Sequence, residues 1–367
     1  MKCRTRRTIR VAVAAGFVTL AGLSTTLLAQ SRDAAIDSLE AQAREAWRTT
    51  MHQTSTLWEG CFHATYPSTE WVEVECAAAP AYRSALPKVA NREQVVGNGF
   101  DFVAGAPSGH LFSSVAGSFP KATGVTSEKS VGVAAFGDGG ILGTNEYTLQ
   151  VNTNFDHSAA CLTFTKCVAW QQYVLSTNTP VSLTSNSLTD ETEVFIEYWL
   201  IDFGKHTGAD ICPAGFLDAG EDAEGPGDDC VQNTPATEIA KGQLPITDLA
   251  DLKLSGSATA GGTDAATVTF DGEAFTATVK DSFTDIASGW SQAEFNVLGN
   301  AGGSRADFNN GVSLTAEIAV SDGSTAAPTC VSPNSEDGTT GETNNLTLGS
   351  CTATGGSTPF IEFTESN

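Results

Sequence analysis

The stretch ATVTFDGEAFTATV, residues 266–279, decides the fold of this chain. On each side of its centre, apolar and polar residues alternate, and such alternation predicts a β-strand with one buried face. Gly272 lies between the two runs and provides the turn that a hairpin needs. The stretch therefore predicts that 266–270 and 274–279 pair as antiparallel strands.

Similar runs follow one another after Gly60, separated by Gly, Asn, Asp, Ser and Pro residues. Short runs divided by such turn residues are typical of antiparallel β structure, and no long helical period lies between them. The sequence thus predicts an all-β fold: an antiparallel β-sandwich of concanavalin-like or jelly-roll type with a short N-terminal helix. The expected strands are 71–76, 100–104, 147–155, 168–175, 194–203, 252–257, 266–270, 274–279, 293–298, 312–320 and 360–364.

The N-terminal residues have the composition of an export signal. Basic residues precede an apolar run over 11–29, which predicts a signal peptide over 1–31, cleaved after Ala29 or Ser31. The pair Arg6-Arg7 leaves twin-arginine export open beside ordinary secretion. We expect the mature protein to be secreted, extracellular or periplasmic. Stable membrane insertion is not expected, because no other run approaches the roughly 20 apolar residues of a membrane span.

Residues 32–58 predict an amphipathic helix ahead of the β-domain. Apolar side chains recur at three- and four-residue steps from Ile36 to Met51, which is the helical period. Such a helix could be a packed lead-in, a pro-segment or a spacer. The remaining residues, 59–367, are expected to form a single β-sandwich domain, because no Pro-rich linker divides them.

The charge of the chain excludes one class of partner. The chain has 19 Lys+Arg and 43 Asp+Glu, a formal net charge of −24. A field of this sign repels phosphate backbones, so nucleic-acid binding is not expected. The expected partner is an extracellular polypeptide or a glycan, and the protein itself is expected to be a monomer.

The cysteines indicate disulfide bonds. The chain has nine, and all except Cys3 lie beyond the predicted signal peptide, which leaves an even number in an exported protein. The eight cysteines form four groups of two that lie close together along the sequence, which favours disulfides within each group. No Cys-x-x-Cys or His-x-x-x-His spacing supports a zinc site. The expected pairs are Cys61–Cys76, Cys161–Cys167, Cys212–Cys230 and Cys330–Cys351.

Residues 205–241 depart from the strand pattern. They hold many Asp and Glu residues among Gly and Pro, which predicts an acidic loop tied at Cys212 and Cys230. Carboxylates clustered on a loop could hold calcium, which takes oxygen ligands. Their spacing does not match an EF-hand, so a solvated loop is the preferred interpretation and no cofactor is expected.

Two of the expected strands carry aromatic and polar side chains at adjacent positions. The first contains Trp170-Gln171-Gln172, and the second contains Glu197-Tyr198-Trp199. In a third, over 293–298, the two-residue period places Glu294 and Asn296 on one face and apolar residues on the other. A sheet face with carboxylates, amides and rings suits either acid–base hydrolysis or stacking on sugars and peptide side chains.

The order of these strands resembles the secreted glutamic peptidases of the eqolisin type. The resemblance also implies a concanavalin-like sandwich, in which a glutamine and a glutamate from neighbouring strands activate water. Residues 195–199 with 212–216 are similar to the neprosin group of glutamic peptidases as well. The eqolisin likeness rests on Trp170-Gln171, Tyr198-Trp199, Ala293-Glu294-Phe295 and Ala306-Asp307-Phe308.

The resemblance implies which residues would act. The catalytic pair would be Glu294 with Gln171, or with Gln172 if the register differs by one. The eqolisin glutamate falls at Leu298 in this chain, and the neprosin glutamate falls at Cys167. The expectation is an acid-active endopeptidase, with a non-catalytic glycan- or surface-binding protein of the same fold as the alternative. The substrate-binding residues would be Trp170, Gln172, Glu197, Tyr198, Trp199 and Asn296.

Overall fold

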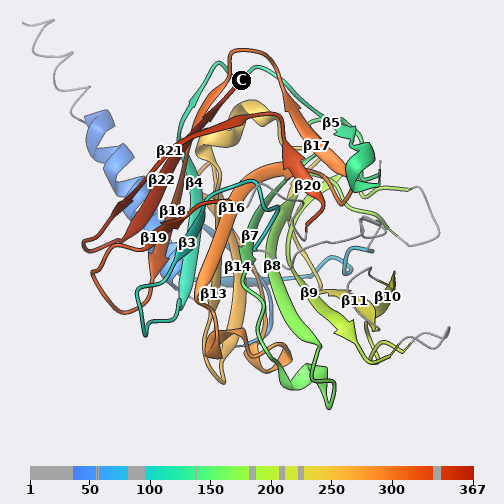
Figure 1. Ribbon diagram of the computed structural model, residues 1–367. Coiled ribbons are helices and arrows are strands. Elements are labelled where there is room, and N and C mark those ends of the chain that lie inside the picture. The colour runs from blue at the N-terminus through green and yellow to red at the C-terminus, as the bar shows by residue number, and fades with distance from the viewer. Residues whose placement is uncertain are drawn as a thin grey trace, which may run out of the picture. The chain divides into compact units, whose positions relative to one another are not determined.

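The computed structural model describes most of the chain (Figure 1). The chain divides into two compact units, residues 1–49 and residues 50–367. The predicted signal peptide, 1–31, lies outside the described residues. The described residues are 36–54, 56, 58–81, 96–137, 139–181, 187–205, 211–221, 227–333 and 340–367.

One helix covers residues 36–53, within the predicted lead-in. Its exposed surface carries an ion pair one turn apart, in which Arg44 Nε lies 3.1 Å from Glu40 Oε1. The apolar period does not correspond to one uniformly buried face, because Leu39 is 65% exposed whereas Trp47 is 4% exposed. No helix among the described residues is long and apolar enough to cross a membrane.

Strands dominate the rest of the described chain. They form two large sheets and one small sheet, and nearly all neighbouring strands are antiparallel. The first sheet has the order β2 (Val72–Val74), β1 (Gly60–Thr65), β15 (Glu273–Lys280), β14 (Thr263–Phe270), β13 (Lys253–Ala258), β4 (Ser114–Thr123), β18 (Ser313–Ser321), β22 (Phe360–Ser366) and β21 (Thr347–Thr354).

The second sheet contains β8, β9 and β16, the three strands in which the sequence analysis found many aromatic and polar side chains. In Figure 1, β16, β7, β8 and β9 lie side by side in this order. The whole order is β10 (Leu217–Glu221), β11 (Asp228–Asn233), β9 (Glu191–Phe203), β8 (Val168–Ser176), β7 (Tyr147–Thr153), β16 (Gln292–Gly299), β3 (Val103–Gly105) and β19 (Thr329–Val331), and β12 (Thr237–Lys241) also pairs with β9.

The small third sheet brings a distant part of the chain beside the second sheet. Its strand β20 pairs in parallel with β17. The order is β20 (Glu342–Asn344), β17 (Ser304–Phe308), β5 (Glu128–Gly132) and β6 (Gly143–Thr144). Short 3₁₀ turns connect strands at η1 (Ala134–Phe136), η2 (Ala159–Cys161), η3 (Ile246–Asp251), η4 (Asp281–Phe283) and η5 (Ile286–Ser288).

The core lies between the first and second sheets, and close ring packing joins them. The rings of Phe119 on β4 and Phe295 on β16 have centroids 5.1 Å apart. A Cβ added to Gly117 on β4 would lie 2.0 Å from Cγ of Phe295, so the ring rests directly on the glycine backbone. These contacts confirm the predicted all-β sandwich with a short N-terminal helix.

Each predicted strand coincides with a strand of the structure, with ends shifted by a few residues. The hairpin at 266–279 is β14 paired with β15, and Asp271 and Gly272 both have positive φ at its turn. Strand β4 was missed because Gly117 and Pro120 interrupt its pattern. Pro120 lies where the β4–β18 register shifts, and such a bulge tolerates a residue that cannot donate a ladder hydrogen bond.

The predicted acidic loop at 205–241 needs correction, because β10, β11 and β12 lie within it. The acids do not all face water: Asp228 and Asp229 are buried, and Asp229 Oδ1 accepts the Asp202 backbone N–H at 3.1 Å. Calcium binding, the alternative left open for this loop, draws on residues that are only partly described. Among the described residues, no group of three or more His, Cys, Asp or Glu side chains could hold a metal ion.

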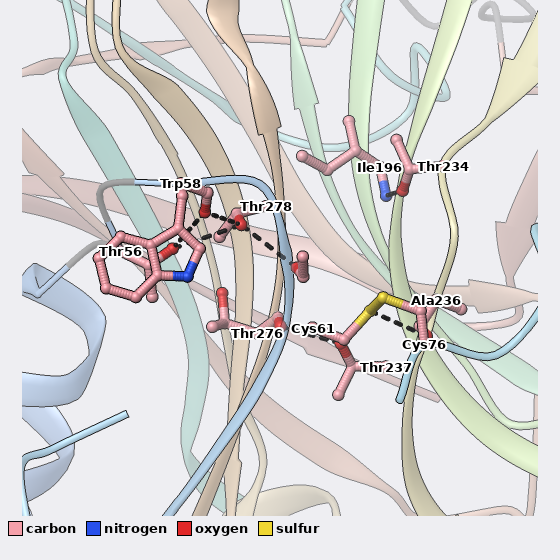
Figure 2. The surroundings of a disulfide bond; sticks show 11 residues. Thr56, Trp58, Cys61, Cys76, Ile196, Thr234, Ala236, Thr237, Thr276 and Thr278 are labelled. Carbon is pink, nitrogen blue, oxygen red and sulfur yellow. Dashed lines mark hydrogen bonds between the residues drawn. A yellow bond between two sulfur atoms is a disulfide. The ribbon is translucent and has the colours of Figure 1, made fainter. Parts of the chain in front are cut away.

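All four predicted disulfides are present: Cys61–Cys76, Cys161–Cys167, Cys212–Cys230 and Cys330–Cys351. Figure 2 shows Cys61–Cys76 beside Ala236 and Thr237. Thr237 is the first residue of β12 in the second sheet, and Ala236 directly precedes it. Thr237 Oγ1 donates to the Thr276 carbonyl of the first sheet at 2.8 Å. The disulfide thus lies where the edges of the two large sheets meet.

Candidate functional site

The second sheet carries polar side chains on the face turned away from the first sheet, called here the outer face. On β7, Leu149 and Val151 enter the core, so the two-residue period turns Gln150 and Asn152 to the outer face. On β8 and β9 the same period turns Gln172 and Glu197 to that face. Because loops and the third sheet cover much of it, most of these side chains are buried.

An open cleft lies on this outer face. Its floor consists of side chains from β7, β8 and β9, and its walls come from loops and from the start of β20. The lining residues are Pro80, Ala81, Ile141, Thr148, Gln150, Trp170, Gln172, Val174, Ser176, Asn178, Thr179, Pro180, Phe195, Glu197, Trp199, Asn233, Asn300, Ala301, Gly302, Thr340 and Glu342.

A glutamine and a glutamate face each other at the floor of this cleft. Gln172 on β8 and Glu197 on β9 are direct partners in the antiparallel register. The indole of Trp199 lies between them, and its Nε1–H donates to Glu197 Oε1 at 2.8 Å and to Gln172 Oε1 at 3.0 Å. The sheet register therefore holds a carboxyl and a carboxamide side by side.

The Glu197 carboxyl has an altered acidity. Burial raises its pKa to about 7, although hydrogen bonds from Trp199 and Asn233 oppose this rise. Part of the residue still reaches solvent, unlike its neighbours along β9. A carboxyl with this pKa can exchange a proton near neutral pH, which is a requirement for general acid–base chemistry.

A hydrogen-bonded chain leads from Gln172 to further carboxylates. Its Nε2 donates to Asn152 Oδ1 at 2.8 Å and to Gln150 Oε1 at 3.1 Å. Asn152 Nδ2 donates in turn to Glu294 Oε2 at 2.7 Å, and Gln150 Nε2 donates to Glu342. Each amide of this chain is thereby fixed in orientation, which rigidifies the floor of the cleft.

The structure corrects the predicted Gln171–Glu294 pair. Gln171 points into the space between the two large sheets, where its Nε2 donates to Tyr173 Oη at 2.9 Å and to Asp264 Oδ2 at 3.0 Å. Glu294 points to the outer face, on the opposite side of the same sheet. The physical reason is the two-residue period of β8, which allows only one of Gln171 and Gln172 to share a face with Glu294.

Tyr198 also faces inward and does not line the cleft. Its ring belongs to the core and packs on Phe283 with centroids 4.4 Å apart. Trp170, Gln172, Glu197 and Trp199, in contrast, all line the cleft. Four of the six predicted substrate-binding residues are therefore brought together.

Glu294 and Asn296 lie outside the cleft, in a second buried polar cluster. Backbone N–H of Asn98 donates to Glu294 Oε1 at 2.9 Å, and Asn296 Nδ2 donates to Glu365 Oε2 at 3.1 Å. Burial and the nearby Asp101 carboxyl raise the pKa values of both Glu294 and Glu365. A Cβ on Gly97 would overlap the Glu294 carboxyl, so the backbone closes over it and blocks access to water.

A short wall segment, residues 77–81, borders the cleft next to Glu197. Asn233 Nδ2 donates to the Pro80 carbonyl at 3.1 Å, and the Ala81 N–H donates to the Pro180 carbonyl at 3.1 Å. Ala77 forms an isolated bridge with Ala236, immediately after the disulfide at Cys76. The Cys61–Cys76 disulfide thus anchors the start of this wall.

Sequence reasoning missed Gln150, Asn233 and Glu342, which complete the cleft. The strand 147–155 was predicted, and its alternation could have revealed Gln150 as an outer-face residue. Glu342 left no such signal, because β20 is only three residues long and reaches the site through tertiary packing.

No protein-family model, curated protein or solved structure matches this chain.

Proposed function

We propose that this protein is an exported hydrolase of glutamic-peptidase type that cleaves polypeptides in the outer-face cleft. The observation that carries the proposal is the register pair of Gln172 and Glu197 on the cleft floor. This pair supplies a glutamine and a glutamate from neighbouring strands, which is the combination implied by the resemblance to glutamic peptidases of the eqolisin type. Four disulfides suit an oxidising, extracytoplasmic compartment.

Glu197 is the general base in this proposal. Its carboxylate takes a proton from water as the water oxygen attacks the peptide carbonyl carbon, which forms a tetrahedral intermediate. The protonated Glu197 then returns the proton to the leaving nitrogen, and the C–N bond breaks. Because the Glu197 pKa lies near 7, cleavage is expected to be fastest near neutral pH instead of in acid.

Gln172 is the candidate oxyanion donor. Both hydrogens of its amide are engaged with Asn152 and Gln150, and the bond to Gln150 Oε1, at 3.1 Å, is the longer one. Exchange of this longer bond for one to the substrate oxygen would place a donor beside Glu197. Because both Gln172 amide hydrogens already have acceptors in the protein, a second candidate function is favoured as well: a non-catalytic protein that binds peptides or glycans in this cleft.

The test is cleavage of denatured casein by the purified mature protein between about pH 3 and pH 9. We expect Glu197→Gln to lower the rate by at least about 100-fold, since general acid–base groups contribute this much or more. Glu362→Gln, the same change at a half-buried position of β22 in the first sheet, is the matched control and should retain activity.

Full activity in Glu197→Gln would exclude Glu197 as the base. Cleavage at no pH, together with peptide or glycan binding by the intact cleft, would identify the protein as a binding protein.

A further inference from the structure

We propose that the cleft selects polypeptide segments with a lysine or arginine side chain, whose ammonium or guanidinium group it receives beside Glu197 and Glu342. This inference names the substrate class of the proposed hydrolase and rests on that function for its role in cleavage. The selection itself is a binding property of the cleft.

The first argument is the charge of the cleft lining. Glu197 and Glu342 are its two ionisable side chains, and no lysine, arginine or histidine is among the lining residues of the described chain. Two further carboxylates lie directly behind the lining: Asn178 Nδ2 donates to Glu146 Oε1 at 3.2 Å, and Thr179 donates to Glu193. A concave site lined by one sign of charge focuses its field and concentrates ligands of the opposite sign.

The second argument is the direction of the hydrogen-bond donors. The lining amides donate to groups of the protein itself: Gln150 to Glu342, Asn178 to Glu146, and Asn233 to the Pro80 carbonyl. Among the described lining residues, these three amides therefore direct donors at the protein and not at a ligand. An anionic or acceptor-rich ligand would therefore lose its water contacts without replacement.

The third argument is an unused acceptor beside Glu197. Asn233 Oδ1 is buried in the cleft wall and accepts no hydrogen bond from the described residues. Asn233 is the direct partner of Glu197 in the β11–β9 register, so the unused oxygen and the carboxyl lie close together. An ammonium or guanidinium group has several N–H donors and no acceptor, and it can serve both oxygens at once.

The test measures binding separately from cleavage. Short unstructured peptides that differ only in a central Lys, Gln or Glu, made with non-cleavable backbone bonds, are titrated into the full-length wild type and into the Glu197→Gln variant at a pH above the Glu197 pKa of about 7. We expect the Lys peptide to bind the wild type at least about tenfold more tightly than the Glu peptide at low salt, with the difference reduced by high salt. Arg should behave as Lys does.

Glu342→Gln provides the decisive variant, because it removes one cleft charge and is not the proposed base. It should lower the Lys-over-Glu preference severalfold, with the preference taken as the ratio of the two affinities in the same variant. Glu362→Gln makes the same charge change outside the cleft and should leave the preference intact.

Equal binding of the Lys and Glu peptides would overturn the inference, and so would equal effects of Glu342→Gln and Glu362→Gln, because the net charge of the chain would then explain the preference. Selective binding without cleavage would contradict only the proposed function. Cleavage without charge preference would contradict only this inference.

Discussion

Trp199 is the residue on which the chemistry of the cleft depends most directly. Its indole N–H is shared between Glu197 Oε1 and Gln172 Oε1, so one donor sets the distance and orientation of both groups. The same N–H stabilises the charged form of Glu197 and opposes the rise of its pKa caused by burial. Trp199 is therefore a positioning residue with a measurable electrostatic effect.

Trp199→Phe should raise the Glu197 pKa above about 7, because the ring is retained and the hydrogen bond to the carboxylate is lost. The measurement is an NMR titration of the Glu197 carboxyl, supported by the pH profile of kcat/KM. The base form would then appear at higher pH. Trp170→Phe is the control, since the Trp170 Nε1–H donates to the Thr153 carbonyl and not to Glu197. Equal titration of Glu197 in both variants would contradict this account.

Gly117 is a second single residue with a large effect, because it sets how closely β4 packs against Phe295 on β16. The Phe295 ring occupies the position of the missing Cβ, so Gly117→Ala must displace the ring or the strand. We expect the free energy of unfolding to fall by about 1–3 kcal/mol, as in other overpacked cores. Urea denaturation provides the measurement. Ser118→Ala, the next residue on β4, should change it by less than about 0.5 kcal/mol, and a similar loss in both variants would argue against ring contact as the cause.

At the scale of elements, the wall segment 77–81 depends on its anchors. The segment follows the Cys61–Cys76 disulfide, pairs with Ala236 through Ala77 and donates the Ala81 N–H to the Pro180 carbonyl. Loss of the disulfide should therefore affect the cleft beyond its effect on stability.

Cys61→Ser with Cys76→Ser should lower the free energy of unfolding by about 2–4 kcal/mol and also weaken peptide binding in the cleft. Cys161→Ser with Cys167→Ser is the control, because the residues enclosed by this disulfide, 162–166, do not line the cleft. Calorimetry and peptide titration should show a stability loss in both variants and a binding loss only in the first. Equal binding losses would rule out a specific role for the wall.

At the scale of the whole molecule, buried carboxyls make stability depend on pH. Burial raises the pKa of Asp264 to about 8, helped by a hydrogen bond with Asp281, and burial raises the pKa of Glu128 to about 9. The folded state keeps these protons at pH values where the unfolded chain releases them. Stability is therefore fully present below the unfolded pKa values and falls as pH rises toward the folded ones.

The midpoint of thermal unfolding should accordingly decrease from about pH 4 to about pH 9, and each retained proton contributes a slope of about 1.4 kcal/mol per pH unit. Asp264→Asn should flatten the curve between about pH 4 and pH 8, because an amide does not titrate. Glu362→Gln, at a half-buried position of β22, is the control and should leave the slope as it is. Stability that increases over this range would contradict the assignment of Asp264 as a buried acid.

The sequence by itself determined many of the strands and all four disulfides. Alternation with a two-residue period fixed the strands and the hairpin around Gly272, because a strand with one buried face requires that pattern. Neighbouring cysteines predicted every disulfide, since loops of such lengths close readily. It also identified Gln172, Glu197 and Trp199 as candidate binding residues.

Tertiary structure alone decided which face of each strand reaches the cleft. Both faces of β8 are buried, so burial does not distinguish Gln171 from Gln172, and only the position of the first sheet turns Gln171 inward. Glu342 joins the cleft from the third sheet, far along the chain from Gln150. A local pattern records whether a side chain is buried, whereas the partner that buries it is set by packing between distant segments.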